Sequence, residues 1–326
     1  MIEQTYKTIK MEQFQPIDSI YIDPTTDFGF KKLFGEEANK DLLMDFLNSF
    51  LPYSQQIATL AFQKPEQIPV HPEDRKAIFD ILCESESGEK FIIEMQKAAM
   101  SHMMDRALFY TTFPIQSQGI KGTWNFNLTP VYFVGILDFD YDINELRWGK
   151  RKLLRIFNIQ DEDGILMTDK LNFKILQLPF FTKKPEELTT HFEKWCYFLK
   201  NLESFELIPN ILNEPIFMKA LEASKVSNLS TNDYILYQIS KSKKYDMDLV
   251  KEEAQRQGME KGIEKGRIET LIKMVFTAHI NGFSSQQIGD FTKIPLDRIL
   301  AILECYDEKE DLETNVTNIL KRDFIA

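Results

Sequence analysis

The chain has 326 residues, of which 43% are hydrophobic and 12% aromatic, and its formal net charge is −11. This is enough apolar material for a buried core, so a wholly disordered chain is excluded, and the length suits one large domain or two ordinary ones. The acidic balance excludes a surface that is basic overall, so nucleic acid would have to bind a local basic groove or metal ions.

Cysteines and histidines are few and scattered. The three cysteines and four histidines form no spacing pattern. We therefore expect neither a disulfide framework nor a histidine-rich zinc site, and a reducing, cytoplasmic location fits. Residues 1–20 are polar and lack the apolar segment of a signal peptide, so we interpret them as a flexible arm. No apolar run approaches the roughly 20 residues that a membrane helix needs, so we expect no membrane partner.

The first part of the chain passes from a helical to a strand-like pattern. Apolar residues at helical spacing predict a helix from about Asp27 to Leu51, which Pro52 ends. Residues 65–72 contain three prolines and indicate an extended connector. The runs Ala77–Cys83 and Lys90–Gln96 then predict two strands, and the serines and glycine between them favour a turn.

Helices and strands alternate further along. A helix is predicted from about Ala98 to Gln118, followed by the continuous apolar run Thr129–Phe139, which suits a strand covered on both faces. Leu153–Ile159 and Phe173–Leu178 indicate more strands. After Pro185 the pattern becomes helical, with apolar residues spaced four and three apart on one packed face.

The tail changes character at about Lys241. Gly258, Gly262 and Gly266 recur every four residues among charged side chains, so on a helix they share one face. That face is either part of a solvated, charged helix, which we favour, or a seam against a second copy of the chain.

The last segment has the pattern of a short helix-turn-helix. Ser284 followed by Gln287 is a capping-box pattern, and another helix is predicted to begin at Leu296. A helix that reads DNA should present basic or amide side chains near its start, whereas Asp297 and Arg298 offer one acid and one base. We therefore favour a packing or interaction module.

Two acids stand within the predicted strand pair. If the hairpin turns about Ser87, Asp80 faces Glu94, and facing residues have Cβ atoms about 5 Å apart. Since side chains alternate along a strand, Glu94 and Gln96 lie on the face that carries Asp80. Facing like charges destabilise a strand pair, and a bound Mg²⁺ would offset that repulsion. The alternative is an ordinary exposed hairpin face with solvated acids.

The residues around this pair resemble a known family. Arg75–Ile81 and Phe91–Gln96 resemble the corresponding stretches of the Rpn group, recombination-promoting nucleases often labelled transposases, within the PD-(D/E)XK superfamily. Asp27–Phe34 is similar to the opening motif of the family, and Thr129–Phe139 to its next strand. The resemblance covers roughly residues 20–300.

This resemblance implies an α/β fold with a restriction-endonuclease-like mixed sheet flanked by helices, here followed by a C-terminal helical extension. It implies Mg²⁺-dependent cleavage of DNA by Asp80, Glu94 and Gln96, with Asp80, Glu94 and the carbonyl of Met95 holding the metal. Gln96 stands where the wider superfamily has Lys. Lys offers a positive charge and Gln only dipoles, which favours slow turnover.

Further residues fall at family positions, as accessory or DNA-contacting candidates: Asp27, Lys31, Lys32, Arg106, Tyr110 and Gln116. Asp27 either assists the metal or caps its helix, and we favour the cap. Lys31 and Lys32 either meet phosphates or are solvated. The last three residues step by four and six, so they need not share one helix face.

We expect three parts, namely the arm at 1–20, a nuclease-like core at 21–184 and a helical region at 185–326. The first functional hypothesis is a Mg²⁺-dependent DNA endonuclease acting in recombination or in mobile-element processes. The second is a catalytically weak or inactive relative that works through protein or DNA contacts. The expected partners are DNA and, through the C-terminal helices, a second copy of the chain.

Overall fold

The computed structural model describes residues 17–67, 77–97, 102–119, 122, 125–141, 151–307 and 309–323. Most of the expected arm, Arg75 and Lys76 of the hairpin motif and the first residues of the helix predicted from Ala98 lie outside the described residues. The chain divides into two compact units, Met1–Asp246 and Met247–Ala326. This division falls later in the chain than the boundary expected at residue 184.

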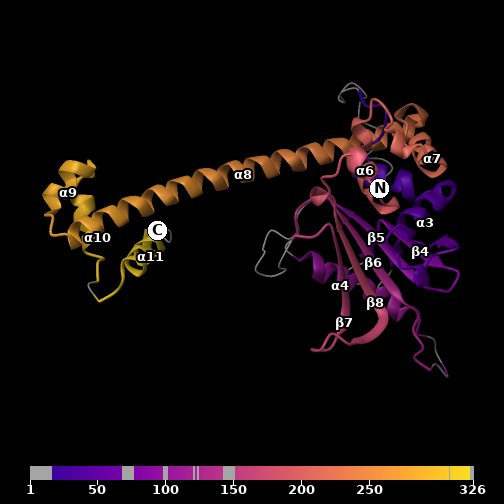
Figure 1. Ribbon diagram of the computed structural model, residues 1–326, viewed down its shortest axis with the longest axis horizontal. Coiled ribbons are helices and arrows are strands. Elements are labelled where there is room, and N and C mark those ends of the chain that lie inside the picture. The colour runs from indigo at the N-terminus through magenta and orange to yellow at the C-terminus, as the bar shows by residue number, and fades with distance from the viewer. Residues whose placement is uncertain are drawn as a thin grey trace, which may run out of the picture. The chain divides into compact units, whose positions relative to one another are not determined.

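The first unit is built on a mixed six-stranded sheet (Figure 1). Its strands, in spatial order, are β1 (Leu60–Phe62), β4 (Ile81–Ser85), β5 (Lys90–Gln96), β6 (Val131–Leu137), β8 (Leu166–Gln177) and β7 (Leu154–Gln160). The pairs β5–β6 and β6–β8 are parallel, and the remaining pairs are antiparallel. A separate short pair joins β2 (Glu66–Gln67) to β3 (Ala77–Ile78). The predicted α/β fold with a mixed sheet is confirmed.

Helices cover both faces of the sheet. On one face, α4 (Met103–Gln116) connects β5 to its parallel neighbour β6, and Met103 and Ala107 of this helix pack on Ile92 and Phe133. The other face is covered by α2 (Asp27–Phe34), α3 (Lys40–Asn48), α6 (His191–Asn201) and α7 (Pro215–Ala223). Every residue of β6 is buried, as its continuous apolar run predicts.

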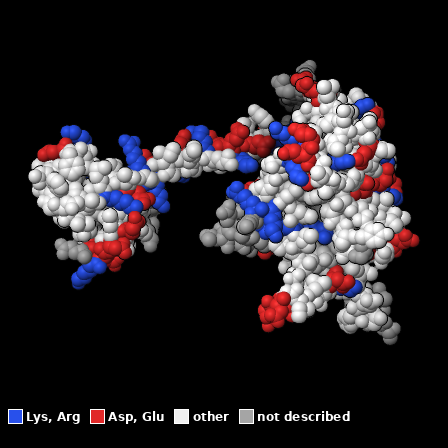
Figure 2. Space-filling view, viewed as in Figure 1, with Lys and Arg blue, Asp and Glu red and all other residues white. Residues whose placement is uncertain are grey.

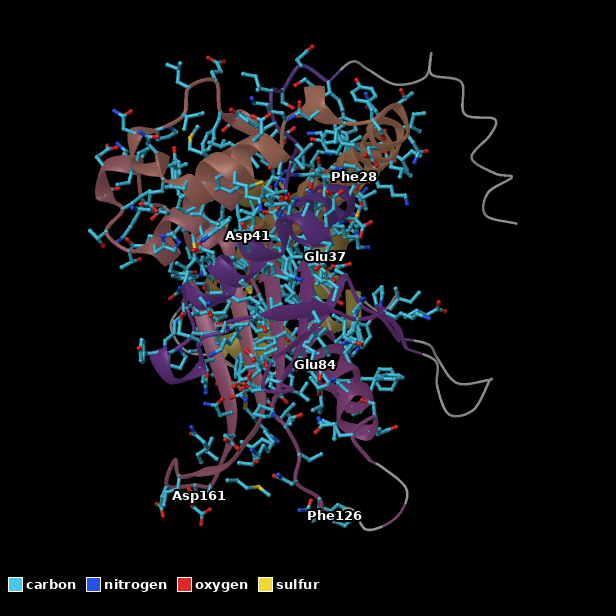
Figure 3. The ribbon with its side chains drawn as sticks, turned by 90° about the vertical axis from the view of Figure 1, so that its right-hand side faces the viewer. Phe28, Glu37, Asp41, Glu84, Phe126 and Asp161 are labelled. Carbon is cyan, nitrogen blue, oxygen red and sulfur yellow. The ribbon has the colours of Figure 1, made fainter. Side chains whose placement is uncertain are left out.

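Short 3₁₀ helices complete the first unit at Glu37–Asn39, Tyr53–Gln55, Leu178–Phe180, Pro185–Glu187, Leu202–Ser204, Asn210–Leu212 and Val226–Asn228. The sheet has two distinct ends. Glu84 of β4 and Asp161, in the turn between β7 and β8, lie toward one end, away from Phe28 of α2 (Figure 3). The start of β4 and the carboxyl end of β5 therefore approach α2.

The single helix predicted from Asp27 to Leu51 is wrong, because the chain breaks at Gly35 into α2 and α3. A Cβ atom on Gly35 would lie 2.8 Å from the carbonyl oxygen of Lys31, so this tight ending suits glycine. The two helices pack on Trp195 of α6, whose ring lies 5.7 Å from Phe34 and 5.8 Å from Phe46. The helices just after residue 185 thus share the core of the first unit.

The second unit consists of helices. The long helix α8 (Thr231–Ile280) begins in the first unit, and α9 (Ser285–Thr292), α10 (Leu296–Leu303) and α11 (Leu312–Asp323) follow. The Ser284 capping box is confirmed, and Lys293 adopts a left-handed conformation in the turn before α10. Acidic and basic side chains are interspersed along α8 (Figure 2). Within the described ranges, no helix is both long and apolar enough to cross a bilayer.

Candidate active site

The register of the β4–β5 hairpin places Asp80 beside Glu94. Ile81 pairs with Ile93 and Leu82 with Ile92, so the predicted turn about Ser87 is confirmed. The predicted strand over residues 77–83 is interrupted, however, because β3 ends at Ile78 and β4 begins at Ile81. Asp80 lies in this break, one residue before the regular ladder starts.

Each of the two acids accepts a hydrogen bond from a backbone N–H on the opposite side of the hairpin. The N–H of Asp80 donates to Glu94 Oε1 at 3.1 Å, and the N–H of Met95 donates to Asp80 Oδ2 at 2.9 Å. The Asp80 carboxylate thus takes the place of the next ladder partner of β5. This explains why β4 begins only at Ile81, and it holds both acids at one end of the hairpin.

Cations approach the pair from the two helical layers. Lys31 Nζ of α2 lies 3.5 Å from Asp80 Oδ1, and a guanidinium nitrogen of Arg106, on α4, lies 3.5 Å from Glu94 Oε2. The Arg106 guanidinium also stacks 4.8 Å above the ring centroid of Tyr110. The structure therefore brings three accessory candidates, Lys31, Arg106 and Tyr110, to the carboxylate pair or next to it.

Burial favours the protonated form of both acids. It raises the pKa of Glu94 to about 8, with repulsion from Asp80 adding to the effect and Arg106 and Lys31 opposing it. Burial also raises the pKa of Asp80, against the opposing charge of Lys31 and the hydrogen bond from Met95. The Glu94 side chain is 5% exposed and that of Asp80 19%. A positive charge bound beside these two acids would strongly stabilise their ionised forms.

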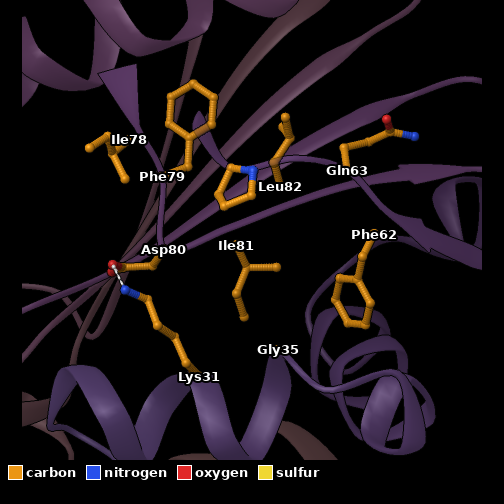
Figure 4. A pocket seen from close by; sticks show the side chains of 10 residues that line it. Lys31, Gly35, Phe62, Gln63, Ile78, Phe79, Asp80, Ile81 and Leu82 are labelled. Carbon is orange, nitrogen blue, oxygen red and sulfur yellow. Dashed lines mark ion pairs between the residues drawn. The ribbon is translucent and has the colours of Figure 1, made fainter. Parts of the chain in front are cut away.

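A cleft with a volume of about 300 Å³ opens beside Asp80 (Figure 4). Asp80 and Lys31 are the charged residues of its lining, which otherwise consists of Gly35, Phe62, Gln63, Pro65, Ile78, Phe79, Ile81 and Leu82. In the close view, the Asp80 and Lys31 side chains point toward each other along one side of the cleft. A ligand in the cleft would therefore meet one acid of the pair and one ammonium group.

The remaining candidates lie at different distances from the pair. Asp27 is not the N-cap, because Thr26 caps α2 by accepting from the N–H of Gly29; instead Asp27 lies 2.6 Å from Lys31 Nζ. Lys32 turns to Glu36 at 2.7 Å and Asp233 of α8 at 3.3 Å. Gln116 ends α4, about 15 Å along the helix from Arg106.

Gln96 follows Glu94 by two positions on β5, so its side chain leaves the same face of the sheet about 7 Å further along. The strand context predicted for Gln96 is thus confirmed. Its part in catalysis remains a hypothesis.

The donor set suits a hard cation. Each oxygen of the two carboxylates contacts a nitrogen within the described residues, and a carboxylate oxygen has lone pairs for more than one such contact, so both groups are chemically able to bind a metal as well. Within a strand, the N–H and C=O of one residue point to the same edge, so the Met95 carbonyl points toward Asp80 as its N–H does. Across the described ranges no cluster of three or more acidic, histidine or cysteine side chains could hold a metal. Two carboxylates, a carbonyl and oxygens from water or phosphate match what Mg²⁺ takes.

One charged cluster next to the site escaped the sequence analysis. The buried carboxylate of Asp23 lies 2.5 Å from Lys244 Nζ and 3.6 Å from Lys97 Nζ. Lys97 directly follows Gln96, and this adjacency was the one available signal. Nothing in the sequence indicates that Lys244, over 200 positions from Asp23, completes the cluster.

A mixed sheet with helices on both faces and a carboxylate pair at the end of its central hairpin defines a restriction-endonuclease-like α/β protein. The family model of the PD-(D/E)XK nuclease family transposases matches residues 24–254, and the chain belongs to this family. Membership supports a nuclease-type function with DNA as the substrate, and nucleases of this family generally use divalent metals. No curated protein and no solved structure matches the chain.

Proposed function

We propose that the protein is a Mg²⁺-dependent DNA endonuclease whose site is the Asp80–Glu94 pair. The observation that carries the proposal is the pair of hydrogen bonds that the two carboxylates accept from backbone N–H groups across the hairpin, Glu94 from Asp80 and Asp80 from Met95. These bonds hold the buried Glu94 carboxylate beside the partly buried Asp80 carboxylate, which lines a cleft. Two acids held this close are electrostatically unfavourable without a cation.

Each residue has a distinct task in this proposal. Asp80, Glu94 and the Met95 carbonyl would hold Mg²⁺, which on binding lowers the pKa of a water and neutralises charge on the phosphate. Arg106 keeps Glu94 in place from α4 and is itself held by Tyr110. The Gln96 amide offers hydrogen bonds on the same face, and we propose that it orients the attacking water.

The reaction is a hydrolysis. The attacking water loses a proton as its oxygen bonds to phosphorus, the bond between phosphorus and one sugar oxygen breaks, and the departing oxygen takes up a proton. The products are one end with a phosphate and one end with a hydroxyl. The family name supports our proposal that this cleavage serves recombination or mobile-element processes. The buried thiols of Cys83 and Cys196, which form no disulfide among the described residues, support our proposal of a reducing, cytoplasmic location.

Nicking of supercoiled plasmid tests the proposal. We expect nicked product with Mg²⁺, none with excess chelator, and none from Asp80→Asn, which keeps the shape of the side chain. Equal nicking by wild type and Asp80→Asn would mean a contaminating nuclease or another site, and the assignment would be wrong.

A second function has its own supporting observation in the second unit. Apolar side chains are exposed around α9 and α10, namely Phe283 (46%), Phe291 (52%), Leu296 (41%) and Leu300 (46%). The rings of Phe283 and Phe291 lie 5.9 Å apart. We propose that this surface mediates self-association, and it is also the candidate surface if the protein acts through contacts alone. Full-length protein that self-associates but never cleaves DNA with Mg²⁺ or Mn²⁺ would favour that alternative.

A further inference from the structure

Lys31 stands where a phosphate entering the cleft would meet it. Its Nζ atom lies 2.6 Å from Asp27 Oδ1 and 3.5 Å from Asp80 Oδ1 (Figure 4). The Asp27 side chain is 69% exposed and that of Lys31 is 42% exposed. The ammonium group is therefore held by one exposed acid and one acid of the pair, and it can leave Asp80 for another anion without crossing a packed core.

The neighbouring cations are less able to do this. The Arg106 guanidinium is fixed over Tyr110 and reaches Glu94 from the opposite face of the sheet. Lys32, although adjacent in sequence, is engaged by Glu36 and by Asp233 of α8. Lys31 is the one of these three that lines the cleft.

The helix that carries Lys31 is docked closely. A Cβ atom on Gly29 would lie 2.0 Å from the carbonyl oxygen of Asp23, and the Thr26 hydroxyl donates to the same carbonyl at 2.7 Å. This contact leaves room for glycine alone and fixes the start of α2 against the chain before it. Lys31, one turn into the helix, is thereby positioned in advance of substrate binding, as efficient stabilisation of a transition state requires.

We propose that Lys31 is a catalytic residue whose ammonium group donates hydrogen bonds to a non-bridging oxygen of the scissile phosphate. It supplies the positive charge that Gln96 does not carry, while Asp27 holds the ammonium group when the cleft contains no phosphate. No bond to Lys31 forms or breaks, and its proton stays on nitrogen. This inference rests on the proposed nuclease function and assigns it a residue outside the β4–β5 hairpin.

Single-turnover nicking by Lys31→Met tests the proposal, because Met keeps the length of the side chain and removes its charge. We expect a rate about 100-fold lower, the usual loss on removing one donor to a transition state. Lys31→Arg should keep most of the rate. Lys40→Met is the matched control, since Lys40 lies on the adjoining helix and pairs with Glu37, and its rate should equal that of the wild type.

A second variant, which places a positive charge at position 96 of the hairpin, distinguishes a catalytic role of Lys31 from a structural one. Gln96→Lys in the Lys31→Met background should restore the rate at least tenfold, which the loss of a purely structural contact would not permit. Calorimetry with Mn²⁺ alone should show binding to Lys31→Met as tight as to the wild type or tighter, because a competing cation has left Asp80. If Lys31→Met melts at a lower temperature than the wild type, the same measurements are made with Lys31→Gln. Adding Gln96→Lys to that variant should again restore the rate at least tenfold.

The outcomes are distinguishable. A wild-type rate in Lys31→Met, lost Mn²⁺ binding or absent rescue by Gln96→Lys overturns the role of Lys31 and leaves the nuclease assignment standing. Absence of metal-dependent cleavage by the wild type overturns both.

Discussion

The ammonium group of Lys244 lies 2.5 Å from the carboxylate of Asp23, although 221 positions of the chain separate them. Asp23 directly precedes the segment that leads into α2, and Lys244 belongs to α8. The N–H of Asp23 also donates to the hydroxyl of Tyr237 at 2.7 Å, and Tyr237 is fully buried in α8. The first turns of α8 are thus part of the first unit and support the helix that carries Lys31.

This ion pair should make the stability of the fold depend on pH in the acidic range. Burial alone would raise the pKa of Asp23, but Lys244 and Lys97 lower it from 3.8 to about 2. A lowered pKa stabilises the fold above the ordinary value of the group, so roughly 2 kcal/mol of unfolding free energy is present at neutral pH and is lost as pH falls from about 4 to 2. Urea unfolding of wild type and Asp23→Asn across this range measures the difference.

The two unfolding curves should converge at pH 2. Lys244→Met should destabilise the protein as well, because it removes the nearer of the two cations beside Asp23. Lys243→Met, at the exposed neighbouring position, should not. Equal stability of all variants at pH 7 would show that the ion pair contributes nothing.

Asp80→Asn should abolish cleavage and leave the metal-free melting temperature equal to that of the parent or higher. The amide oxygen can still accept from the Met95 N–H, while the repulsion of Glu94 is removed. Asp80→Ala is a poorer test, since it leaves that N–H without its partner at a cost of about 1–3 kcal/mol. Differential scanning calorimetry without metal measures the melting temperature, and plasmid nicking measures the activity. Retained activity with a large fall in melting temperature would make Asp80 structural.

Glu94→Gln should lose cleavage through weaker metal binding. The shape of the side chain is kept, and the amide oxygen can still accept from the Asp80 N–H, but the charge that attracts Mg²⁺ is gone. Nicking across a Mg²⁺ titration should show a higher Mg²⁺ requirement and a lower maximal rate. A wild-type rate at ordinary Mg²⁺ would remove Glu94 from the metal site.

The hairpin was the most predictable part of the molecule, since register, turn and facing acids all follow from local pattern. β5 has the predicted bounds, and the Ser87 turn puts Asp80 beside Glu94. The break of the strand at Asp80 was not predictable, because it arises from a side chain that replaces a backbone partner.

Contacts between distant segments were the least predictable. The core includes Trp195 of α6 packed on Phe34 and Phe46, which moves the unit boundary far beyond residue 184. Helical periodicity identified the apolar face of α6 but not the surface against which it packs. In the same way, the family motif made both Lys31 and Lys32 candidates for contact with DNA. The orientation of α2 could not be predicted, and it turns Lys31 toward Asp80 but Lys32 toward Asp233.

The three glycines of α8 should tolerate alanine. A Cβ atom at Gly258, Gly262 or Gly266 would meet nothing within 4 Å in the described part of the chain. If this face is solvated, each substitution should stabilise the helix by roughly 0.5–1 kcal/mol, and the oligomer measured by light scattering should not change. A smaller oligomer in the triple variant would identify the face as a seam between copies.

A chain that ends at Asp246 should keep Mg²⁺-dependent nicking. It retains the sheet, the carboxylate pair and the first turns of α8, in which Tyr237 and Lys244 contact Asp23. It lacks the exposed apolar side chains around α9 and α10, so light scattering should show reduced self-association. The nicking rate and the oligomer size should therefore respond differently to the truncation. If the truncated protein is folded and wholly inactive, the second unit is needed for DNA binding or for an active assembly, and its accessory role is wrong.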